Sequence, residues 1–524
     1  MIATPLFHDM FDFLVRSRPR QTCVVDERRS LSFAEAGTEV NRIANGLRGL
    51  GLRKGERFGY VAKNCADMWL MYLAAARTGA VPVPLNYRLA PVEWLHILKD
   101  AGARALFIGP GYDAPVGQIL GDLPEIAAVI SFDGETAGAP RYDAWLAAQP
   151  DTPVDCGITG ADIFYQMYTS GTTGLPKGVI VTHANYAANI SQCLQMITRL
   201  PDAGESALVV TPLYHAAAVW IAAFSTARGL TIHLKGDFDA CDVVDTLERK
   251  KVSFTFLVPA MIQACLTQVE DIAQRDWSHL KVLMYGASPI AEDVLRRAVT
   301  VFGCDVYQAY GMTETTAILT LLGADEHRRA LAGEQHLLLS CGRALPGSQI
   351  ITADEDDRPA GPGAAGQILA HGPQIVPGYW NLPEATAAFL KDGWAHTGDA
   401  GELDAEGYLY IRDRIKDMVV SGGENIYPRE VENALFAHPD IIDAAVIGVP
   451  DARYGEALLA FIVTAGNMPL PSEDVIAFCR TKLGGYKVPR RVEQVETLPR
   501  NASGKVLKHV LRAPYWSGEK RRVG

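Results

Sequence analysis

Hydrophobic positions along the chain follow two patterns that alternate. Short runs rich in Val, Ile, Phe and Tyr are typical of buried strands, and longer stretches with apolar residues at helical spacing are typical of helices. The first series predicts strands and helices in turn, at residues 57–64, 66–80, 80–86, 92–102 and 105–109. Further strand candidates lie at residues 206–212, 230–234, 252–259 and 281–286. This alternation predicts parallel sheets covered by helices, the α/β class.

The pattern changes after about residue 340. Residues 348–373 carry short strand-like runs separated by Gly and Pro, which predicts a small antiparallel unit. A boundary follows near residues 411–417, and the remaining segment of about 110 residues is long enough to fold alone. Its predicted helices and strands lie at 428–437, 444–448, 460–463 and 472–483. We predict a large N-terminal domain over residues 1–413 and a small α+β C-terminal domain over residues 418–524.

Composition narrows the class of protein. The 524 residues carry 49 Lys and Arg against 60 Asp and Glu, so the net charge is −11. A nucleic-acid partner requires a basic face, and the acidic balance argues against one. The nine cysteines include no C-x-x-C pair and are odd in number, which is typical of a reduced, cytoplasmic protein without a zinc site.

The longest uncharged run, residues 207–227, has the length of a membrane helix. Pro212, Tyr214 and His215 interrupt it, so we predict a buried strand followed by a helix and no integral membrane segment. The N-terminus lacks a basic region followed by an apolar stretch and is not typical of a secretory signal. A cytoplasmic location is therefore expected.

The strongest chemical signal is YTSGTTGLPKGV at residues 168–179, directly after an apolar run. Glycines let backbone N–H groups approach a polyanion, Ser and Thr add donors, and Lys177 adds a positive charge. The pattern predicts a phosphate-binding loop, although the spacing of a Walker A motif is absent. The alternative is a flexible Gly/Thr hairpin without a ligand.

Six further motifs follow this loop in order. They are PLYH at 212–215, YGASP at 285–289, QAYGMTE at 308–314, GWAHTGD at 393–399, DRIKDMVVSGGENIYPREVE at 413–432 and LPRNASGK at 498–505. Together the seven motifs resemble the signature of the adenylate-forming (AMP-binding) superfamily, which includes acyl-CoA synthetases, peptide-synthetase adenylation domains and firefly-type luciferases. The resemblance spans nearly the whole chain and is strongest to coumarate-CoA ligase and medium-chain acyl-CoA synthetases.

Thr313 and Glu314 place a hydroxyl beside a carboxylate, which suits a phosphate oxygen and a hard cation. The resemblance implies that Thr313 contacts the α-phosphate and Glu314 holds Mg²⁺, whereas the residues alone also allow Thr313 to be a helix N-cap. Asp399 resembles the aspartate that binds both ribose hydroxyl groups, and its alternative is a turn residue. Arg414 resembles an arginine that also reaches the ribose, and its alternative is an exposed linker charge.

The resemblance implies further contacts with ATP and coenzyme A. The ATP contacts are Thr169, Ser170, Gly171, Thr172, Thr173, Gly174, Lys177, Gly286, Ala287, Ser288, Gln308, Ala309, Tyr310 and Gly311. A second loop, which resembles the one that turns toward the site for thioester formation, consists of Gly422, Gly423, Glu424 and Asn425.

Three residues receive roles from the resemblance alone. Lys505 resembles the lysine that neutralises charge between the carboxylate and the α-phosphate, and without the motif it would be a solvated lysine. Lys416 occupies the family's hinge position, which places a hinge at 414–417 and makes the C-terminal domain mobile. His215 corresponds to a gate between an acyl pocket and a thiol tunnel, although a lone histidine beside alanines is more often a core residue.

A G-x-G-x-x-G match at residues 361–366 is a turn in our interpretation. It follows an acidic, proline-containing stretch and precedes a strand-like run, so the strand and helix of a dinucleotide-binding motif are missing.

The resemblance implies an AMP-forming acyl- or aryl-CoA ligase that uses ATP, Mg²⁺ and coenzyme A. A carboxylic acid and ATP would give acyl-AMP and pyrophosphate, and after a domain rotation the acyl group would pass to CoA with release of AMP. The alternative is a stand-alone adenylating enzyme that loads a carrier protein or another acceptor. A medium-chain acyl or aryl acid is the expected substrate class, and a homodimer is one arrangement that the sequence leaves open.

Overall fold

The computed structural model describes residues 6–136, 138–169, 175–288, 290, 292–354, 356–422, 424–451, 453–500 and 506–516. The chain divides into two compact units, Met1–Gln349 with His371–Ala395, and Ile350–Ala370 with His396–Gly524. This division groups residues 350–370 and 396–413 with the C-terminal part of the chain. The boundary at residue 413 and the hinge at 414–417 stay predictions.

A nine-stranded sheet forms the centre of the first unit. Its strands are β1 (Thr22–Val25), β2 (Ser30–Ser32), β9 (Ser206–Val209), β10 (Thr231–Leu234), β11 (Val252–Leu257), β12 (Val282–Gly286), β13 (Asp305–Tyr310), β14 (Thr320–Leu322) and β15 (Arg343–Ala344). They lie in the order β15-β14-β13-β12-β11-β9-β10-β1-β2. All neighbours from β13 to β1 are parallel, and β2, β14 and β15 are antiparallel.

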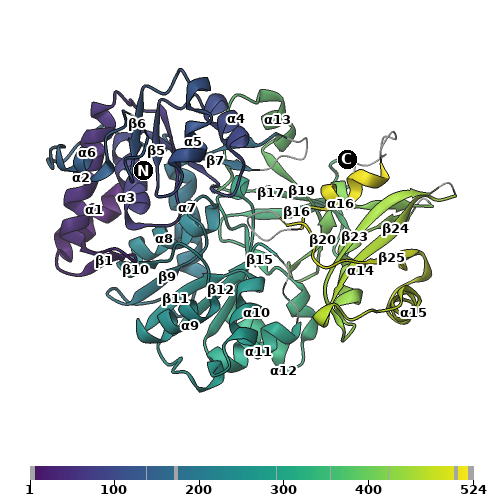
Figure 1. Ribbon diagram of the computed structural model, residues 1–524. Helices are drawn as coiled ribbons and strands as arrows, with labels where there is room; N and C mark the ends of the chain where they lie inside the picture. Colours follow the sequence, from purple (N-terminus) through teal and green to yellow (C-terminus); the bar gives the residue numbers. More distant parts are fainter. Residues whose placement is uncertain are drawn as a thin grey trace. The chain divides into compact units, whose positions relative to one another are not determined.

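Helices cover this sheet, as the alternating pattern predicts. Three of them, α9 (Ala240–Arg249), α10 (Pro259–Gln268) and α11 (Glu292–Phe302), pack against β9, β11 and β12 through one hydrophobic cluster (Figure 1). The apolar run at 207–227 forms β9 and then α8 (Ala216–Arg228), which confirms the predicted strand and helix. In the part of the chain that the structure describes, no helix combines the length and the apolar character that crossing a membrane requires.

A four-stranded parallel sheet contains β3 (Arg57–Val61), β4 (Val81–Leu85), β5 (Ala105–Ile108) and β6 (Ala128–Ser131), in the order β4-β3-β5-β6. The predicted helices between these strands are α3 (Ala66–Thr78) and α4 (Pro91–Ala101). Helix α3 ends at Gly79, whose φ of +75° lies in the left-handed region that favours glycine. Two further strands, β7 (Ile163–Thr169) and β8 (Lys177–Thr182), form an antiparallel hairpin.

The remaining helices and the short strand of this unit have these bounds: α1 (Phe7–Ser17), α2 (Phe33–Gly49), α5 (Asp113–Gly117), α6 (Tyr142–Ala147), α7 (His183–Met196), α12 (Ala324–Ala332), α13 (Pro383–Phe389) and β18 (Leu390–Lys391).

The second unit contains the predicted antiparallel segment. Its strands are β16 (Gln349–Ala353), β17 (Gly366–His371), β19 (Trp394–Leu403) and β20 (Leu409–Arg414), and β19 pairs antiparallel with β20. The G-x-G-x-x-G match at 361–366 leads into β17 and not into a helix, which confirms that it is a turn.

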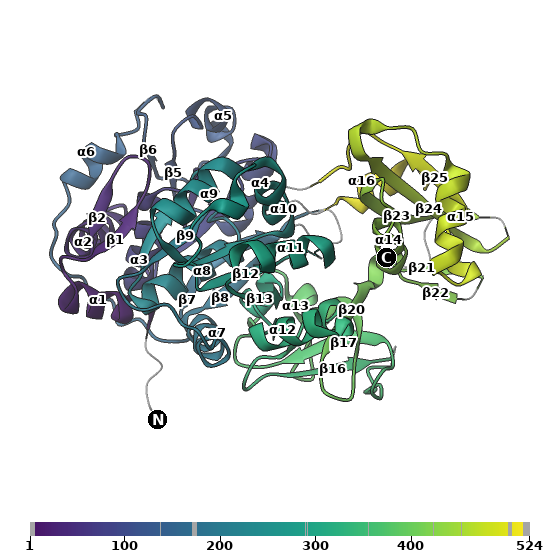
Figure 2. The same cartoon turned by 90° about the horizontal axis from the view of Figure 1, so that it is seen from below.

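A second sheet follows, formed by β21 (Val419–Ser421), β22 (Glu424–Ile426), β23 (Ile441–Asp451), β24 (Gly455–Thr464) and β25 (Arg491–Gln494). Successive side chains of a strand point to opposite faces. Val446 therefore packs with α14 (Pro428–Phe436) and α15 (Ser472–Lys482), while Ile447 packs with Leu511 of α16 (Lys508–Arg512). Figure 2 shows α15 and α16 on opposite sides of these strands.

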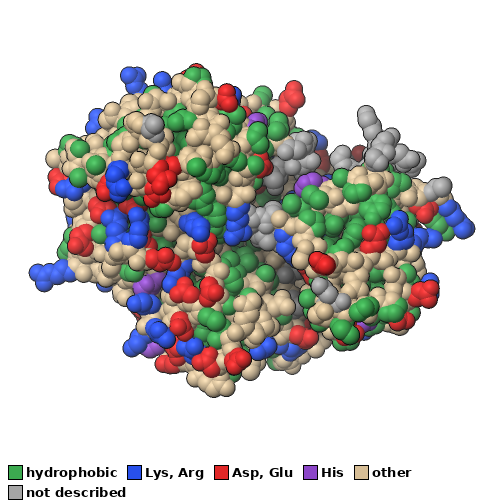
Figure 3. Space-filling model, viewed as in Figure 1, with side chains coloured by type: hydrophobic (Ala, Val, Ile, Leu, Met, Phe, Trp, Pro, Cys, Tyr) green, Lys and Arg blue, Asp and Glu red, His purple; other side chains and the backbone are tan. Residues whose placement is uncertain are grey.

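Acidic and basic side chains are interspersed on the face of the molecule drawn in Figure 3. This mixture suits a protein with a net charge of −11 and differs from the basic stripe that a nucleic-acid surface requires.

Two histidines lie in contact inside the first unit, His8 on α1 and His183 at the start of α7. Their ring centroids are 6.3 Å apart in an edge-to-face arrangement. Neither ring nitrogen of His183 has a hydrogen-bond partner among the described residues. Burial, with a smaller contribution from the nearby His8, lowers the pKa of His183 to about 3. Burial also lowers the pKa of His8.

We expect this buried pair to destabilise the first unit as the pH falls below about 6.5, the ordinary pKa of histidine in the unfolded chain. The folded protein keeps His183 neutral down to about pH 3, so the unfolded state binds more protons between these values. For His183 alone the loss at pH 5 is about 2 kcal/mol. The variant His183→Phe should flatten the fall in melting temperature between pH 7 and pH 5. His336→Phe, at an exposed position, is the control. An unchanged slope in His183→Phe would contradict this assignment.

Candidate active site

Two of the predicted ATP-binding segments follow neighbouring strands of the nine-stranded sheet. Residues 286–288 lie at the end of β12, and residues 308–314 lie at the end of β13 and directly after it. In the parallel pair β12 and β13, Tyr285 lies opposite Gln308 and Gly286 opposite Ala309. The buried Tyr285 hydroxyl donates to Gln308 Oε1 at 3.3 Å. Open α/β sheets bind ligands at the carboxyl ends of their strands. The structure therefore brings residues 286–288 and 308–311 together, as the motifs predict.

The backbone in this region is tightly packed. A Cβ atom on Gly286 would lie 2.2 Å from the Ala309 carbonyl oxygen, and one on Gly311 would lie 2.2 Å from that of Ala317. Ala287 has a φ of +66°, in the left-handed region that costs a non-glycine residue about 1 kcal/mol. Ala287 and Ser288 are both exposed. Strained backbone of this kind gathers where proteins bind ligands.

Thr313 and Glu314 lie in η3 (Thr313–Thr315), a 3₁₀ turn that follows β13. Its N-cap position is occupied by Met312, so the alternative interpretation of Thr313 as an N-cap is wrong. The Glu314 side chain is buried, and Glu314 Oε1 accepts a hydrogen bond of 2.9 Å from the Tyr379 hydroxyl.

Glu314 is the predicted metal ligand. Across the described ranges, no group of three or more His, Cys, Asp and Glu side chains could hold a metal ion by itself. One held carboxylate fits Mg²⁺, because this cation commonly takes one or two protein carboxylates and completes its shell with phosphate oxygens and water.

The hairpin β7–β8 carries the predicted phosphate loop. Thr169 ends β7 and pairs with Lys177, the first residue of β8, so both lie at the base of the loop. Ser170, Gly171, Thr172, Thr173 and Gly174 lie outside the described residues.

Buried polar side chains hold the base of this hairpin. Gln166 accepts a 3.2 Å hydrogen bond from Arg57 and donates one of 3.0 Å to the Tyr168 hydroxyl, which in turn donates to Asp100. The guanidinium of Arg57 stacks 3.2 Å from the ring centroid of Trp380. These contacts hold the end of β7 that leads into the phosphate loop.

Residues 374–380, which we term the bridging segment, connect this hairpin with η3. At one end, the Thr316 hydroxyl donates to the Gln374 carbonyl at 2.6 Å, and the Val376 amide donates to the Glu314 carbonyl at 3.1 Å. At the other end, the Trp380 amide donates to the Gly178 carbonyl at 2.7 Å. Between them, the Lys177 ammonium lies 5.1 Å from the ring centroid of Tyr379.

Sequence reasoning did not select this segment. The available signal is a pair of aromatic residues directly after a Pro-Gly turn, in PGYW at 377–380. The fold shows that Tyr379 of this pair lies beside Lys177, the predicted phosphate lysine, and Glu314, the predicted metal ligand.

His215 directly precedes α8, in a turn whose backbone is hydrogen-bonded to side chains from other elements. The Tyr72 hydroxyl donates to the Leu213 carbonyl at 2.9 Å, and the Leu213 amide donates to Asn64 at 2.7 Å. Burial lowers the pKa of His215 to about 4, with a smaller contribution from the Arg88 charge, so the imidazole is neutral at pH 7. Its Nε2 is buried and has no hydrogen-bond partner within the described part of the chain. A neutral ring whose buried Nε2 has no hydrogen-bond partner among the described residues suits a gate.

The predicted ribose contacts lie on one hairpin of the second unit. Asp399 in β19 pairs with Arg414 at the end of β20, and Arg414 Nε lies 3.6 Å from Asp399 Oδ1. Lys416 follows in the short turn η5 (Ile415–Asp417), where burial lowers its pKa and the Arg414 charge lowers it further. Two carboxylates, Asp413 directly before the predicted hinge and Asp417 at its end, are anchored by hydrogen bonds or ion pairs. Asp413 accepts from the Arg429 amide at 2.9 Å, and Asp417 pairs with Arg512 at 2.6 Å.

The second predicted loop connects β21 and β22. Gly422 has a left-handed φ of +62°, and its amide donates to the Tyr454 carbonyl at 2.8 Å, while Glu424 is exposed. Gly423, the side chain of Asn425 and the whole of Lys505 lie outside the described residues.

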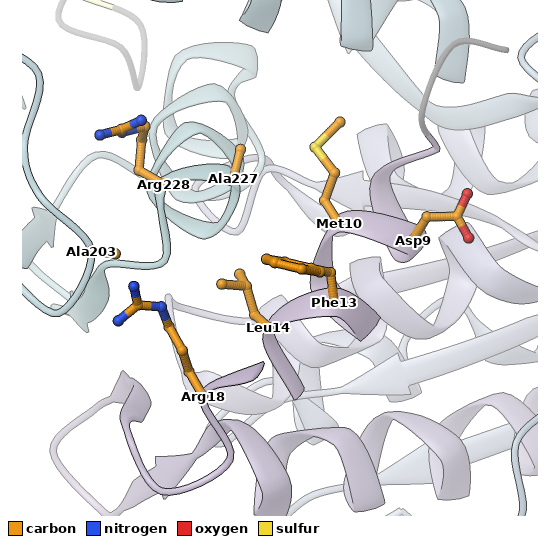
Figure 4. A pocket seen from close by; sticks show the side chains of 8 residues that line it. All are labelled: Asp9, Met10, Phe13, Leu14, Arg18, Ala203, Ala227 and Arg228. Atoms are coloured by element: carbon orange, nitrogen blue, oxygen red, sulfur yellow. The ribbon is translucent and has the colours of Figure 1, made fainter. Parts of the chain in front are cut away.

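A groove of about 390 Å³ lies between α1 and α8, with Met10, Phe13 and Leu14 on one side and Arg18 and Arg228 near one end (Figure 4). Its lining includes none of the predicted site residues, so it is a feature separate from the ATP chemistry.

Comparison with known proteins decides the family. The chain matches the family model of the AMP-binding enzyme over residues 11–380, and the AMP-binding enzyme C-terminal domain over residues 430–505. The chain belongs to the AMP-binding enzyme family.

Individual relatives match this chain along nearly its full length. The chain is 36% identical to a fatty acid--[acyl-carrier-protein] ligase, ScoC, of Streptomyces coeruleorubidus, over 100% of this chain and 98% of that protein. It is 38% identical to a feruloyl-CoA synthase of an Amycolatopsis species, over 95% of this chain and 96% of that protein. The crystal structure of ATP-bound MatB from Rhodopseudomonas palustris matches with a TM-score of 0.88 and 28% identity, covering 99% of this chain and 100% of that one.

These matches confirm the predicted superfamily, the α/β fold with a large N-terminal and a small C-terminal domain, and the predicted class of acyl- or aryl-CoA ligases. The roles of individual site residues, the domain boundaries and the choice of acid stay predictions.

Proposed function

We propose that this protein activates a medium-chain acyl or aryl carboxylic acid with Mg·ATP and transfers the acyl group to coenzyme A. The observation that supports this most strongly is the contact of Lys177 and Glu314 with one side chain, Tyr379, beside the paired ends of β12 and β13. A cation for phosphate and a carboxylate for a metal ion are the two groups that binding of Mg·ATP requires.

In the first half-reaction, a carboxylate oxygen of the acid attacks the α-phosphorus of ATP, and pyrophosphate leaves. Lys177 and the phosphate loop hold the triphosphate, Thr313 contacts the α-phosphate, and Asp399 and Arg414 hold the ribose. Glu314 would hold Mg²⁺, which would supply charge neutralisation on the phosphates. Lys505 offsets the negative charge that gathers between the acid and the α-phosphate in the transition state. Positioning and electrostatics account for the catalysis, without a covalent bond to the enzyme.

In the second half-reaction, the CoA thiolate attacks the acyl carbonyl carbon and AMP leaves. We propose that residues 418–524 rotate about 414–417, which withdraws Lys505 and brings in Gly422, Gly423, Glu424 and Asn425. The two family matches support this boundary, because they leave residues 381–429 between them. His215, neutral and placed before α8, would open the route for the thiol.

The acid would lie along α8. Residues 216–218 are alanines, which leave space beside His215, and the buried Trp220 stacks on Phe224 with ring centroids 5.0 Å apart. A fixed aromatic pair beyond a short stretch of small residues suits a medium acyl chain or a single ring. All nine cysteines are free thiols, which supports a reducing, cytoplasmic location.

A carrier-protein thiol is the second candidate acceptor. It is favoured by the 36% identity to a fatty acid--[acyl-carrier-protein] ligase over 100% of this chain. Both acceptors share the first half-reaction and differ only in what presents the thiol.

The acceptor can be identified by measuring pyrophosphate release with acetate, hexanoate, decanoate, palmitate, benzoate, coumarate and malonate, each with and without CoA. We expect multiple turnovers only when CoA is present, with hexanoate, decanoate or an aryl acid preferred. The variant Glu314→Gln should be slow with every acid. Release that stops after one equivalent and is not accelerated by CoA would contradict the CoA assignment and favour the carrier protein.

Lys505→Ala should slow acyl-AMP formation by a factor on the order of 10²–10³, because one preorganised charge at the transition state is lost. Thioester formation from added acyl-AMP should stay within a few-fold of wild type, since Lys505 is withdrawn in that step. Lys482→Ala, an exposed lysine of the same unit, serves as the control in both assays. Equal losses in the two half-reactions would argue against domain rotation.

Asp399→Asn should weaken ATP binding about tenfold, because hydrogen bonds to a charged acceptor contribute about 1.5–3 kcal/mol. In wild type, 2′-deoxy-ATP should bind more weakly than ATP, and this difference should disappear in the variant. Glu402→Gln removes a carboxylate from the same strand and is the matched control. Additive losses from the variant and from the deoxy nucleotide would show that Asp399 does not contact the 2′-hydroxyl.

A further inference from the structure

Tyr379 makes two different contacts with the predicted phosphate site. Its hydroxyl donates to Glu314 Oε1 at 2.9 Å, and its ring face lies 5.1 Å from the Lys177 ammonium. The first contact reaches the predicted metal ligand and the second reaches the predicted phosphate lysine. One rigid side chain therefore touches the two charged groups on which binding of Mg·ATP depends.

The Tyr379 ring is itself fixed by its surroundings. Its backbone amide donates a 3.0 Å hydrogen bond to the Thr386 hydroxyl, and its ring packs edge-to-face on the buried Phe389, with ring centroids 5.7 Å apart. Val179 pairs with Tyr379 in an antiparallel bridge, which ties the backbone to β8. The half-buried phenol thus has little freedom to move away from either partner.

The two parts of the side chain suit this role. A phenol hydroxyl donates well to a carboxylate, and the 2.9 Å hydrogen bond fixes the position of Glu314 Oε1. The ring face attracts the Lys177 ammonium without cancelling its charge, as a carboxylate partner would.

We infer that Tyr379 is a positioning residue of the ATP site, which orients the Glu314 carboxylate for Mg²⁺ through its hydroxyl and the Lys177 ammonium for phosphate through its ring. The inference rests on the proposed function, because it requires Mg·ATP as the ligand. Partners that orient a metal ligand in this way commonly change metal affinity by about 10- to 100-fold when they are removed.

Two variants separate the two contacts. Tyr379→Phe removes the hydroxyl and keeps the ring face, and Tyr379→Leu removes both. Tyr410→Phe is the matched control, because it removes a phenol-to-carboxylate hydrogen bond of 3.2 Å to Asp404 in the second unit. The measurement is calorimetric titration with ATP alone, in excess MgCl₂ and in EDTA, without an acid substrate. The ratio of the two dissociation constants gives the contribution of the metal, independently of turnover.

For Tyr379→Phe we expect this ratio to fall about tenfold, while the dissociation constant in EDTA stays within about twofold of wild type. For Tyr379→Leu we expect the constant in EDTA to rise about three- to tenfold as well, because the cation–π contact is lost. Tyr410→Phe should leave both constants unchanged. Melting temperatures without ligand identify any variant that fails to fold, and Tyr379→Phe alone then carries the test.

A wild-type ratio in Tyr379→Phe would overturn the inference and leave the ligase proposal intact, since that proposal is tested by pyrophosphate release. An equal loss in MgCl₂ and in EDTA would also overturn it, because a merely structural role weakens both. A wild-type protein that does not bind ATP in either buffer would overturn the ligase proposal and this inference together.

Discussion

The parallel register between β12 and β13 is the constraint on which the first half of the candidate site depends. It sets Gly286 opposite Ala309, and the backbones approach so closely that a side chain at Gly286 would strike the Ala309 carbonyl. A one-residue shift would turn alternate side chains to the other face and break the contact between Tyr285 and Gln308. The segments that follow both strands are thus placed before any ligand arrives.

The phosphate chemistry is added to this frame by a residue stretch from much later in the chain. The bridging segment bonds to η3 at one end and to β8 at the other, although η3 follows β13 and β8 precedes the whole run from β9 to β13. Hydrogen bonds between backbone groups fix its path, so the side chains of Tyr379 and Trp380 have defined partners. The site therefore depends on three segments that are distant in sequence and that only the folded sheet brings together.

Local patterns predicted much of this from the sequence. The 3.6-residue period and the terminal glycine locate α3 and α4 within about two residues, because a helix end with left-handed backbone has a strong residue preference. The motifs likewise predict roles for Glu314 and Lys177, because a carboxylate and an ammonium group have evident chemistry toward a metal ion and a phosphate. Tyr379 was not predicted from the sequence. Its two contacts, with Glu314 and with Lys177, span about 65 and 200 residues, and no local hydrophobic period indicates such a pairing. The grouping of residues 350–370 with the C-terminal part was not predicted either, because pairing between strands that are distant in sequence determines it and local composition does not.

The charged residues of the candidate site are divided between the two units, and this division bears on the proposed domain rotation. Lys177 and Glu314 belong to the first unit, in which the bridging segment holds them, whereas Asp399, Arg414 and Lys416 belong to the second. Asp413, directly before the predicted hinge at 414–417, accepts from the Arg429 amide, and Asp417, the last residue of that hinge, pairs with Arg512. The bond from Arg429 to Asp413 joins the two sides of the predicted hinge, so the rotation proposed for residues 418–524 must break it, whereas the Asp417–Arg512 pair can stay intact. The predicted phosphate lysine Lys177 and the predicted metal ligand Glu314 both belong to the unit without the predicted hinge, so the proposed rotation leaves their contacts with Tyr379 unchanged.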